Sequence, residues 1–138
     1  MDECLFCRLA AGEIPATRVA ETERALAFMD IFPAVPGHVL VIPRAHADDA
    51  LAADDADLAA CVALAARVAR AQEAALGAEG VNLLSSSRPA AGQTVFHLHV
   101  HVLPRVAGDG FSFPWPVAPG DPEAIAALAE RLRAALGA

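Results

Sequence analysis

The sequence lacks the features that would place it in a membrane or on a secretory route. Apolar residues make up 56% of its 138 residues. No uninterrupted apolar run approaches the ~20 residues that a membrane-spanning helix needs. The first residues have neither the basic start nor the apolar core of a secretory signal. Three cysteines, an odd number, argue against a disulfide framework. We therefore expect a soluble, cytoplasmic protein without a membrane partner.

Positive charge is also scarce. The net charge is −7, with 17 acidic residues against 10 basic ones. Acidic residues gather at Asp48, Asp49 and residues 54–57, so we expect no broad basic face and no nucleic-acid partner. A small nucleotide remains compatible, because a few local donors can hold one phosphate against an unfavourable overall field.

The chain shows no internal repeat and no low-complexity linker, so its length predicts one domain. Apolar patterns that end at Gly or Pro predict strands at 17–20, 24–30, 38–42, 81–84 and 95–103. Helices are predicted at 4–11, from 54 or 55 to 76, and after the Asp121 N-cap signal. The sequence thus predicts an α+β fold: a five-stranded antiparallel sheet with one long helix, a short N-terminal helix and a C-terminal helix. In the long helix, the residues on or near one apolar stripe are Leu58, Cys61, Val62, Ala65, Val68 and Leu76.

Three of the five histidines, His97, His99 and His101, alternate with apolar residues. In a strand this period of two puts the three imidazoles on one face. A single strand histidine would be explained as an ordinary polar residue. Three in alternation are not explained by packing, because each buried imidazole needs a hydrogen-bond partner. We interpret the segment as a functional site.

Two chemistries would use such an arrangement. Three neutral imidazoles can hold a catalytic zinc that keeps its fourth position open. Alternatively, one imidazole attacks the substrate while its neighbours orient it and stabilise developing charge. The alternation by itself leaves both chemistries open.

The triad and several shorter segments together resemble the histidine triad family, whose mark is His-x-His-x-His followed by apolar residues. The likeness covers nearly the whole chain and is closest to the Hint-like branch, in particular to its bacterial zinc-containing members. It implies a single histidine triad domain over 1–138, with 105–138 as a C-terminal extension that ends in a helix. The other matching segments are Cys4-Leu5-Phe6-Cys7, Gly12-Glu13-Ile14-Pro15-Ala16, Ala27-Phe28-Met29-Asp30-Ile31, Pro36-Gly37-His38-Val39-Leu40-Val41-Ile42-Pro43 and Ala91-Gly92-Gln93-Thr94-Val95-Phe96.

The resemblance implies a catalytic role for three histidines. His99 would be the nucleophile, His101 a hydrogen-bond donor on the phosphate side, and His38 a distal imidazole in the same relay. If Nδ1–H of His99 donates to a backbone carbonyl, its Nε2 lone pair is free to attack phosphorus. The attack would form a nucleotidyl-His99 intermediate, which water then opens.

The resemblance also implies a pocket for a purine nucleotide. Asp30 would accept from the ribose hydroxyls, and Thr94 with Gln93 would contact the phosphate or the leaving group. Further contacts are expected from Phe6, Leu9, Ile14, Phe28, Ile31, Ser86 and Val95. For the apolar members of this set, ordinary core is the alternative interpretation.

One loop departs from the family pattern. The family commonly has an Asn near the phosphate, where this chain reads Ser85-Ser86-Ser87. A hydroxyl is shorter than an amide and cannot both donate and accept through a planar group. This departure affects the leaving-group contacts and so the substrate preference.

The Cys4-x-x-Cys7 pair has metal-ligand spacing. A redox pair is the alternative, but no thioredoxin-like strand and helix pattern surrounds it. The resemblance implies a structural zinc completed by His46 and His97. The alternative for His46 is an exposed loop histidine, and Cys61 is expected to be a buried structural cysteine.

The leading functional hypothesis is a hydrolase or transferase acting at the α-phosphorus of purine nucleoside phosphoramidates or related nucleotide adducts. Cleavage of dinucleoside polyphosphates, the work of another branch of the family, is the second enzyme hypothesis. A nucleotide-binding or interaction protein with weak catalysis is the alternative from another class.

A homodimer is expected, as is usual in the family. The helix 55–76 and the strand 81–84 offer more apolar surface than one small sheet covers, and pairing would hide strand edges. The stretch 104–119, with Phe111, Phe113 and Trp115, is expected to reach the partner's active site, as the C-terminal tail does in the Hint-like branch.

Overall fold

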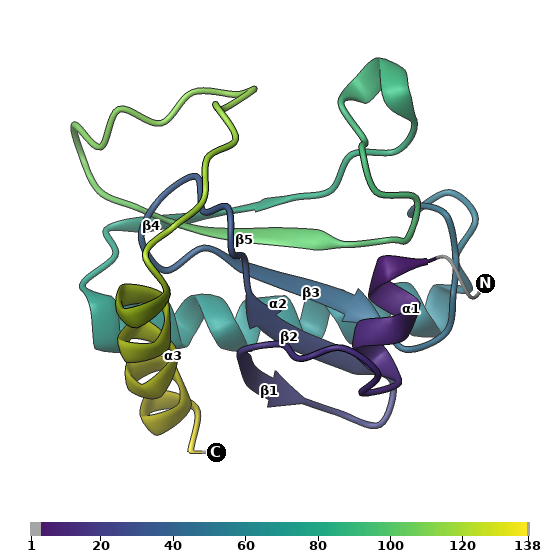
Figure 1. Ribbon diagram of the computed structural model, residues 1–138, viewed down its shortest axis with the longest axis horizontal. Helices are drawn as coiled ribbons and strands as arrows, with labels where there is room; N and C mark the ends of the chain where they lie inside the picture. The colour runs from purple at the N-terminus through teal and green to yellow at the C-terminus, as the bar shows by residue number, and fades with distance from the viewer. Residues whose placement is uncertain (1–3, 138) are drawn as a thin grey trace.

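The computed structural model describes residues 4–137 and places five strands in one sheet of order β1-β2-β3-β5-β4 (Figure 1). All four neighbouring pairs in that order are antiparallel, so the predicted α+β fold is confirmed. The strands are β1 (Arg18–Glu21), β2 (Ala25–Met29), β3 (Val39–Pro43), β4 (Gly80–Leu84) and β5 (Val100–Arg105).

Three α-helices accompany the sheet: α1 (Leu5–Ala10), α2 (Asp55–Leu76) and α3 (Pro122–Leu136). A 3₁₀ turn, η1 (Pro89–Ala91), lies in the loop between β4 and β5. The predicted N-cap of α3 is confirmed, because the Asp121 side chain accepts from the Ala124 N–H at 3.0 Å. None of the described helices combines the length and the apolarity needed to cross a membrane.

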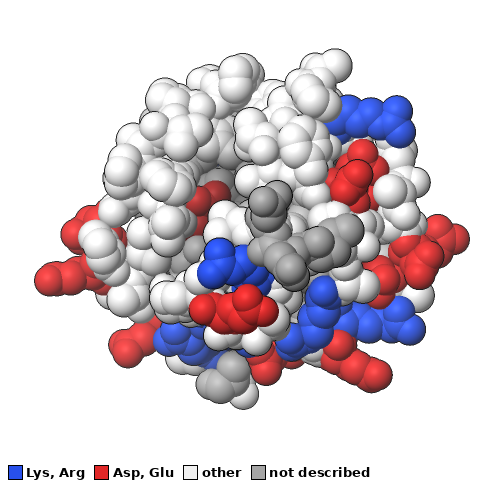
Figure 2. Space-filling model, turned by 45° about the vertical axis from the view of Figure 1, so that its right-hand side comes forward, with Lys and Arg blue, Asp and Glu red and all other residues white. Residues whose placement is uncertain are grey.

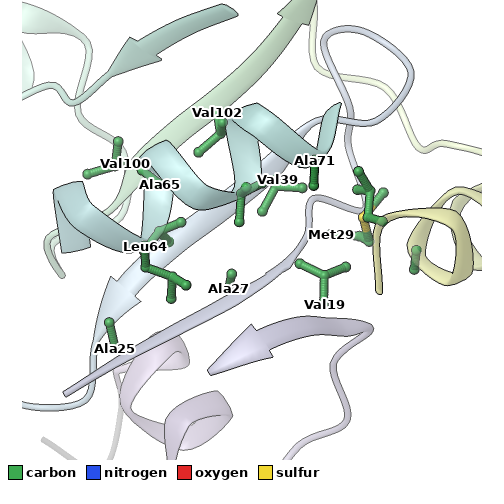
Figure 3. Packing of buried hydrophobic residues seen from close by; sticks show 14 of the residues in the cluster. Val19, Ala25, Ala27, Met29, Val39, Leu64, Ala65, Ala71, Val100 and Val102 are labelled. Atoms are coloured by element: carbon green, nitrogen blue, oxygen red, sulfur yellow. The ribbon is translucent and has the colours of Figure 1, made fainter. Parts of the chain in front are cut away.

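The sheet is covered on both faces, and for that reason every residue of β2 and β3 is buried. Helix α2 covers one face, and α3 packs against α2 and β1 (Figure 1). Helix α1 packs on the other face, where Phe6 and Leu9 contact a second cluster. Toward α2 the sheet presents Val39, Val41, Val100 and Val102 with several alanines (Figure 3). Toward α1 it presents Leu26, Phe28, Leu40 and Ile42.

The buried stripe of α2 differs in part from the predicted one. Val62 was placed in the stripe, but its side chain is 45% exposed. Leu64, Ala71 and Gln72 are buried and were not predicted. The stripe is shifted because α2 lies across several strands, and contact with them, not apolarity alone, selects its buried positions.

The predicted strand 95–103 begins later than expected, at Val100. The β3–β5 ladder pairs Val41 with Val100 and does not continue to Pro43, which has no N–H to donate. The Leu98 N–H instead donates to the carbonyl of Ala47 at 2.7 Å. His97 and His99 therefore lie in a segment that precedes β5.

The C-terminal extension is fastened to the loop that follows β2. The Gly120 N–H donates to the carbonyl of Ile31 at 2.9 Å. The ring of Pro33 lies so close that a Cβ at position 120 would be 2.7 Å from its Cδ. The extension thus returns across the end of the sheet before it enters α3 (Figure 1).

Charged side chains of both signs are interspersed on the face of the molecule shown in Figure 2. That face offers no continuous cationic surface of the kind that binds a nucleic-acid backbone.

Candidate active site

Three imidazoles meet on the face of the sheet opposite α2. His101 lies in β5 opposite Leu40 of β3, and His38 immediately precedes β3. The ring centroids of His99 and His101 are 5.0 Å apart, and those of His38 and His101 are 5.1 Å apart. The structure thus brings together the three residues that the sequence predicted as catalytic.

Hydrogen bonds fix the tautomers of His38 and His101. The Ala34 N–H donates to Nδ1 of His38 at 3.0 Å, so the proton of this imidazole is on Nε2. Nε2–H of His38 then donates to Nδ1 of His101 at 2.9 Å. The proton of His101 is therefore on Nε2, which is available as a donor. Burial lowers the pKa of both rings to about 3, so both are neutral near pH 7.

His99 has the opposite arrangement of donor and acceptor. Its Nδ1–H donates to the carbonyl of His97 at 2.8 Å, because a carbonyl can only accept. Its Nε2 therefore has a free lone pair. Burial lowers the pKa of His99 below its usual range, so this lone pair is present at neutral pH. The hydroxyl of Ser85 donates to the carbonyl of His99 at 2.8 Å and helps to hold the residue. This arrangement suits a nucleophile.

A second cluster contains Cys4, Cys7, His46 and His97, whose ligand atoms all lie within 4.8 Å of one another. Nδ1 of His97 is 3.3 Å from Sγ of Cys4, and Nδ1 of His46 is 3.3 Å from Sγ of Cys7. In a tetrahedral zinc site with bonds of about 2.3 Å to sulfur and about 2.0 Å to nitrogen, neighbouring S and N atoms are roughly 3.5 Å apart. The four residues fit zinc.

The hydrogen-bond partners of His46 and His97 also orient these two imidazoles for metal binding. Nε2–H of His97 donates to the carbonyl of Pro43, and Nε2–H of His46 donates to Asp48, both at 2.9 Å. Each Nδ1 lone pair is thereby directed toward the sulfurs. Burial, and then the neighbouring Cys4, raises the pKa of the Cys7 thiol to about 11. At neutral pH its thiolate therefore forms only when a nearby positive charge, such as a metal ion, stabilises it.

The structure separates the three triad histidines between these two sites. His97 faces the cysteines, whereas His99 and His101 face His38. Among the described residues, the donor atoms of the triad do not converge as a set of metal ligands. Asp30, His38 and His101 do converge, but the proton on Nε2 of His38 makes that atom a donor and not a ligand. The geometry thus favours a nucleophilic triad.

Asp30 lies beside the imidazoles, at the end of β2. Its Oδ1 accepts from the Phe32 N–H at 2.7 Å, and its Oδ2 is 3.5 Å from Nε2 of His38. Burial raises the pKa of this carboxyl to about 6, so it is mostly ionised at pH 7 and can accept hydrogen bonds from a diol.

The other predicted pocket residues fall into two groups. Phe6, Leu9, Phe28 and the half-buried Ile14 form one apolar cluster, in which the ring of Phe6 lies 5.3 Å from that of His99. In the loop before the triad, Thr94 is exposed, while Ser86 and Val95 are half-buried. Ile31 is 60% exposed. The amide of Gln93 is buried and bonds to the backbone at Arg88, Asp48 and Val95, which shapes the loop.

Trp115 lies over the hydrogen-bonded pair His38 and His101, called the relay below, of its own chain. Its ring lies edge-on to His101 at 5.1 Å and to His38 at 5.7 Å between centroids. Phe111 and Phe113 pack against it. We expected this stretch to reach a partner's active site. Within this chain the stretch contacts its own imidazoles, because the extension turns back over β5 toward Ile31. Contact with a partner's active site stays a prediction.

Sequence reasoning missed several residues that support the site. The backbone N–H of Ala34 and the side chain of Asp48 carry no sequence signal for these contacts, because the conformation of the loops decides where they point. Gln72 did have a signal: it is a polar residue four positions after Val68 and four before Leu76, inside the apolar stripe of α2.

An antiparallel sheet that presents paired neutral imidazoles beside a Cys and His cluster defines a histidine triad domain. The HIT domain family model matches residues 11–108, and the chain belongs to the HIT family. An adenosine 5′-monophosphoramidase of Schizosaccharomyces pombe is 38% identical over 130 residues, which cover 94% of this chain and 95% of that protein.

Solved structures show the same fold. A Zn-bound histidine triad family protein from Mycobacterium smegmatis superimposes with a TM-score of 0.89 at 39% identity, covering 99% of this chain and 94% of that one. A HIT family hydrolase from Clostridium thermocellum has a TM-score of 0.68 at 35% identity, covering 82% of this chain and 98% of that one. Relatives of this chain thus include a zinc-bound protein and a hydrolase.

Because the imidazoles of His38 and His101 are shielded from water, we expect them to stay unprotonated well below pH 6.5. The ring signals of His38 and His101 should stay at neutral values in an NMR titration from pH 8 to pH 5. Trp115→Ala should let water reach both rings and raise their pKa from about 3 toward 6.5, so that titration begins within this window. Val117→Ala, at an exposed position of the same extension, should behave like the wild type. Wild-type rings that titrate near pH 6.5 would contradict the assigned burial.

The same shift has a defined sign for stability. Because the folded pKa of each ring is lowered, its contribution to stability is complete above about pH 6.5 and is lost as the pH falls toward about 3.

Proposed function

We propose that this chain is a hydrolase or transferase, similar to nucleoside phosphoramidases, that acts at the α-phosphorus of purine nucleoside phosphoramidates or related adducts. The observation that carries the proposal is the pair of opposite tautomers: His99 offers a free Nε2 lone pair, and its neighbour His101 offers an Nε2–H donor. The name of the Schizosaccharomyces pombe relative supports the substrate class, and the Hint-like branch fits it.

The reaction proceeds in two displacements. Nε2 of His99 attacks phosphorus, and the bond to the leaving nitrogen breaks as that nitrogen keeps the electron pair, takes a proton from solvent and departs as a neutral amine. The positive charge left on His99 is stabilised by the Nδ1–H bond to the His97 carbonyl. Nε2–H of His101 donates to the phosphoryl oxygen where negative charge develops. Water then attacks phosphorus and gives one proton to solvent, while the bond to Nε2 breaks and its electron pair returns to His99. A nucleoside monophosphate leaves, and His99 is neutral again.

The remaining residues of the site bind and select the nucleotide. Asp30 accepts from the ribose hydroxyls, and Thr94 contacts the phosphate. The cluster of Phe6, Leu9, Ile14 and Phe28 forms the apolar side of the base pocket. Trp115 and Ser85-Ser86-Ser87 border the leaving group, so we assign leaving-group preference to them.

The nucleophile is tested by His99→Asn. This variant should abolish hydrolysis of adenosine 5′-phosphoramidate, because the lost interaction is made mainly in the transition state. Its affinity for AMP should stay within about tenfold, or ~1.4 kcal/mol. Near-wild-type turnover would reject the mechanism. Wild-type preference for diadenosine tetraphosphate in the same steady-state assay would instead indicate the dinucleoside polyphosphate hydrolases of the family.

We propose that zinc at Cys4, Cys7, His46 and His97 has a structural role. The four ligands come from three segments distant in sequence: the N-terminus with α1, the loop after β3, and the segment before β5. A closed set of two sulfurs and two nitrogens leaves no position for substrate. Such an ion would join α1 to the sheet.

Metal analysis and thermal unfolding test this role. Purified protein should contain about one zinc per chain, as a closed four-ligand site implies. Cys4→Ser combined with Cys7→Ser should remove the zinc and lower the melting temperature, while turnover per folded molecule falls less. Cys61→Ser, at a buried cysteine outside the cluster, should keep the zinc. Zinc-free protein of unchanged stability would refute the structural role.

We propose a homodimer that pairs the β4 edges of two copies. In the described part of the chain, β4 pairs with β5 alone and lies at the edge of the sheet. Leu83 on this strand is 44% exposed, and Val62 on α2 is 45% exposed. A twofold interface at this edge would cover both apolar residues and the unpaired backbone groups.

Light scattering tests the dimer. At micromolar concentration the wild type should have roughly twice the chain mass, since obligate interfaces of this kind typically bury about 2,000 Å² or more. Leu83→Glu should shift the protein to monomer. Leu51→Glu, which places the same charge at a 69% exposed position in the loop between β3 and α2, should not. A monomeric wild type would contradict the proposal.

A further inference from the structure

Gln72 is a fully buried polar residue on the apolar face of α2. It lies one helical turn after Val68 and one before Leu76, where the periodicity favours an apolar side chain. It faces the sheet from the side opposite the catalytic imidazoles.

The amide of Gln72 bridges two backbone carbonyls. Its Nε2 donates to the carbonyl of Gly37 at 3.0 Å and to that of Val102 at 3.1 Å. An amide NH₂ has two hydrogens, so both are used. Gly37 immediately precedes His38, and Val102 immediately follows His101. One side chain therefore holds the two segments that carry the relay.

This bridge lies where the strand ladder ends. The β3–β5 pairing begins at Val39 opposite Val102, and Gly37 lies beyond it. Gly37 also passes directly against α2: its φ is +90°, and a Cβ there would lie 2.6 Å from Cδ1 of Leu76. The carbonyl of Gly37 has left the ladder, and Gln72 supplies the donor that β5 does not.

The amide of Gln72 stabilises the fold by giving the Gly37 carbonyl a donor, but it also carries a cost. Among the described residues, Oε1 of Gln72 has no hydrogen-bond partner, although it is buried. A Met side chain has similar length and would bury no such acceptor. Among neutral side chains, only an amide has two hydrogens on one nitrogen and can donate to both carbonyls at once.

We propose that Gln72 is a positioning residue that holds His38 and His101 at hydrogen-bonding distance, 2.9 Å between Nε2 and Nδ1. Its part in turnover rests on the function proposed above. Without the bridge the two segments separate, His101 loses the partner that fixes its tautomer, and its Nε2–H no longer points at the phosphoryl group.

The test compares Gln72→Met with the wild type in the zinc-loaded protein. The N–H···N bond between His38 and His101 gives a ¹⁵N–¹⁵N scalar coupling, which falls steeply as the two nitrogens separate. In Gln72→Met this coupling should disappear. The kcat for adenosine 5′-phosphoramidate should fall about tenfold with KM within about twofold, because misplaced catalytic groups reduce the rate more than binding.

Val68→Ala is the matched control. It removes buried apolar atoms one turn earlier on the same helix face. It should lower stability but keep the coupling, and kcat per folded molecule should stay within about twofold. If Gln72→Met does not fold, Gln72→Glu keeps the shape with at most one donor and should show a weakened coupling.

Three results would overturn the proposal: an unchanged coupling in Gln72→Met, an unchanged coupling in Gln72→Glu where Met does not fold, or the same loss of coupling and kcat in Val68→Ala. A lost coupling in Gln72→Met, together with a wild type that does not hydrolyse the phosphoramidate, would support the bridge while refuting the proposed function. The two inferences therefore fail separately.

Discussion

The hydrogen bond from Nδ1–H of His99 to the carbonyl of His97 connects the two sites of this protein. The side chain of His97 faces Cys4 and Cys7, while its carbonyl sets the tautomer of His99, the proposed nucleophile. A zinc ion bound by that side chain would therefore also fix the carbonyl that orients His99. One residue serves both sites because side chain and backbone point in different directions in an extended segment.

Burial gives the imidazoles of His38, His99 and His101 their chemical character. His38 and His99 are almost inaccessible, and burial is the largest cause of the lowered pKa of each. Removal from water disfavours the charged rings, so they remain neutral donors and acceptors near pH 7. Burying polar ring nitrogens costs free energy unless they form hydrogen bonds. Here Nδ1 of His38 accepts from the Ala34 N–H, Nε2–H of His38 donates to His101, and Nδ1–H of His99 donates to the His97 carbonyl.

The C-terminal extension completes this enclosure. Its attachment through Gly120 brings Trp115 over His38 and His101, and the same attachment holds the loop after Asp30. The loop after Asp30 and the aromatic side chain that covers the imidazoles are thus held as one unit. Burial of His38 and His101 and the position of the loop after Asp30 therefore depend on the same segment.

The sequence by itself determined the order of the elements, the alternating spacing of the triad histidines, and the ligand spacing of Cys4 and Cys7. These features depend on residues close together along the chain. Only the tertiary structure decided where β5 begins, since this depends on Pro43 and on the distant carbonyl of Ala47. It also decided that Trp115 covers its own chain and that Gln72 bridges Gly37 and Val102. Such contacts join residues tens of positions apart, and no local pattern specifies the geometry of a loop or the exact face that a helix turns toward a sheet.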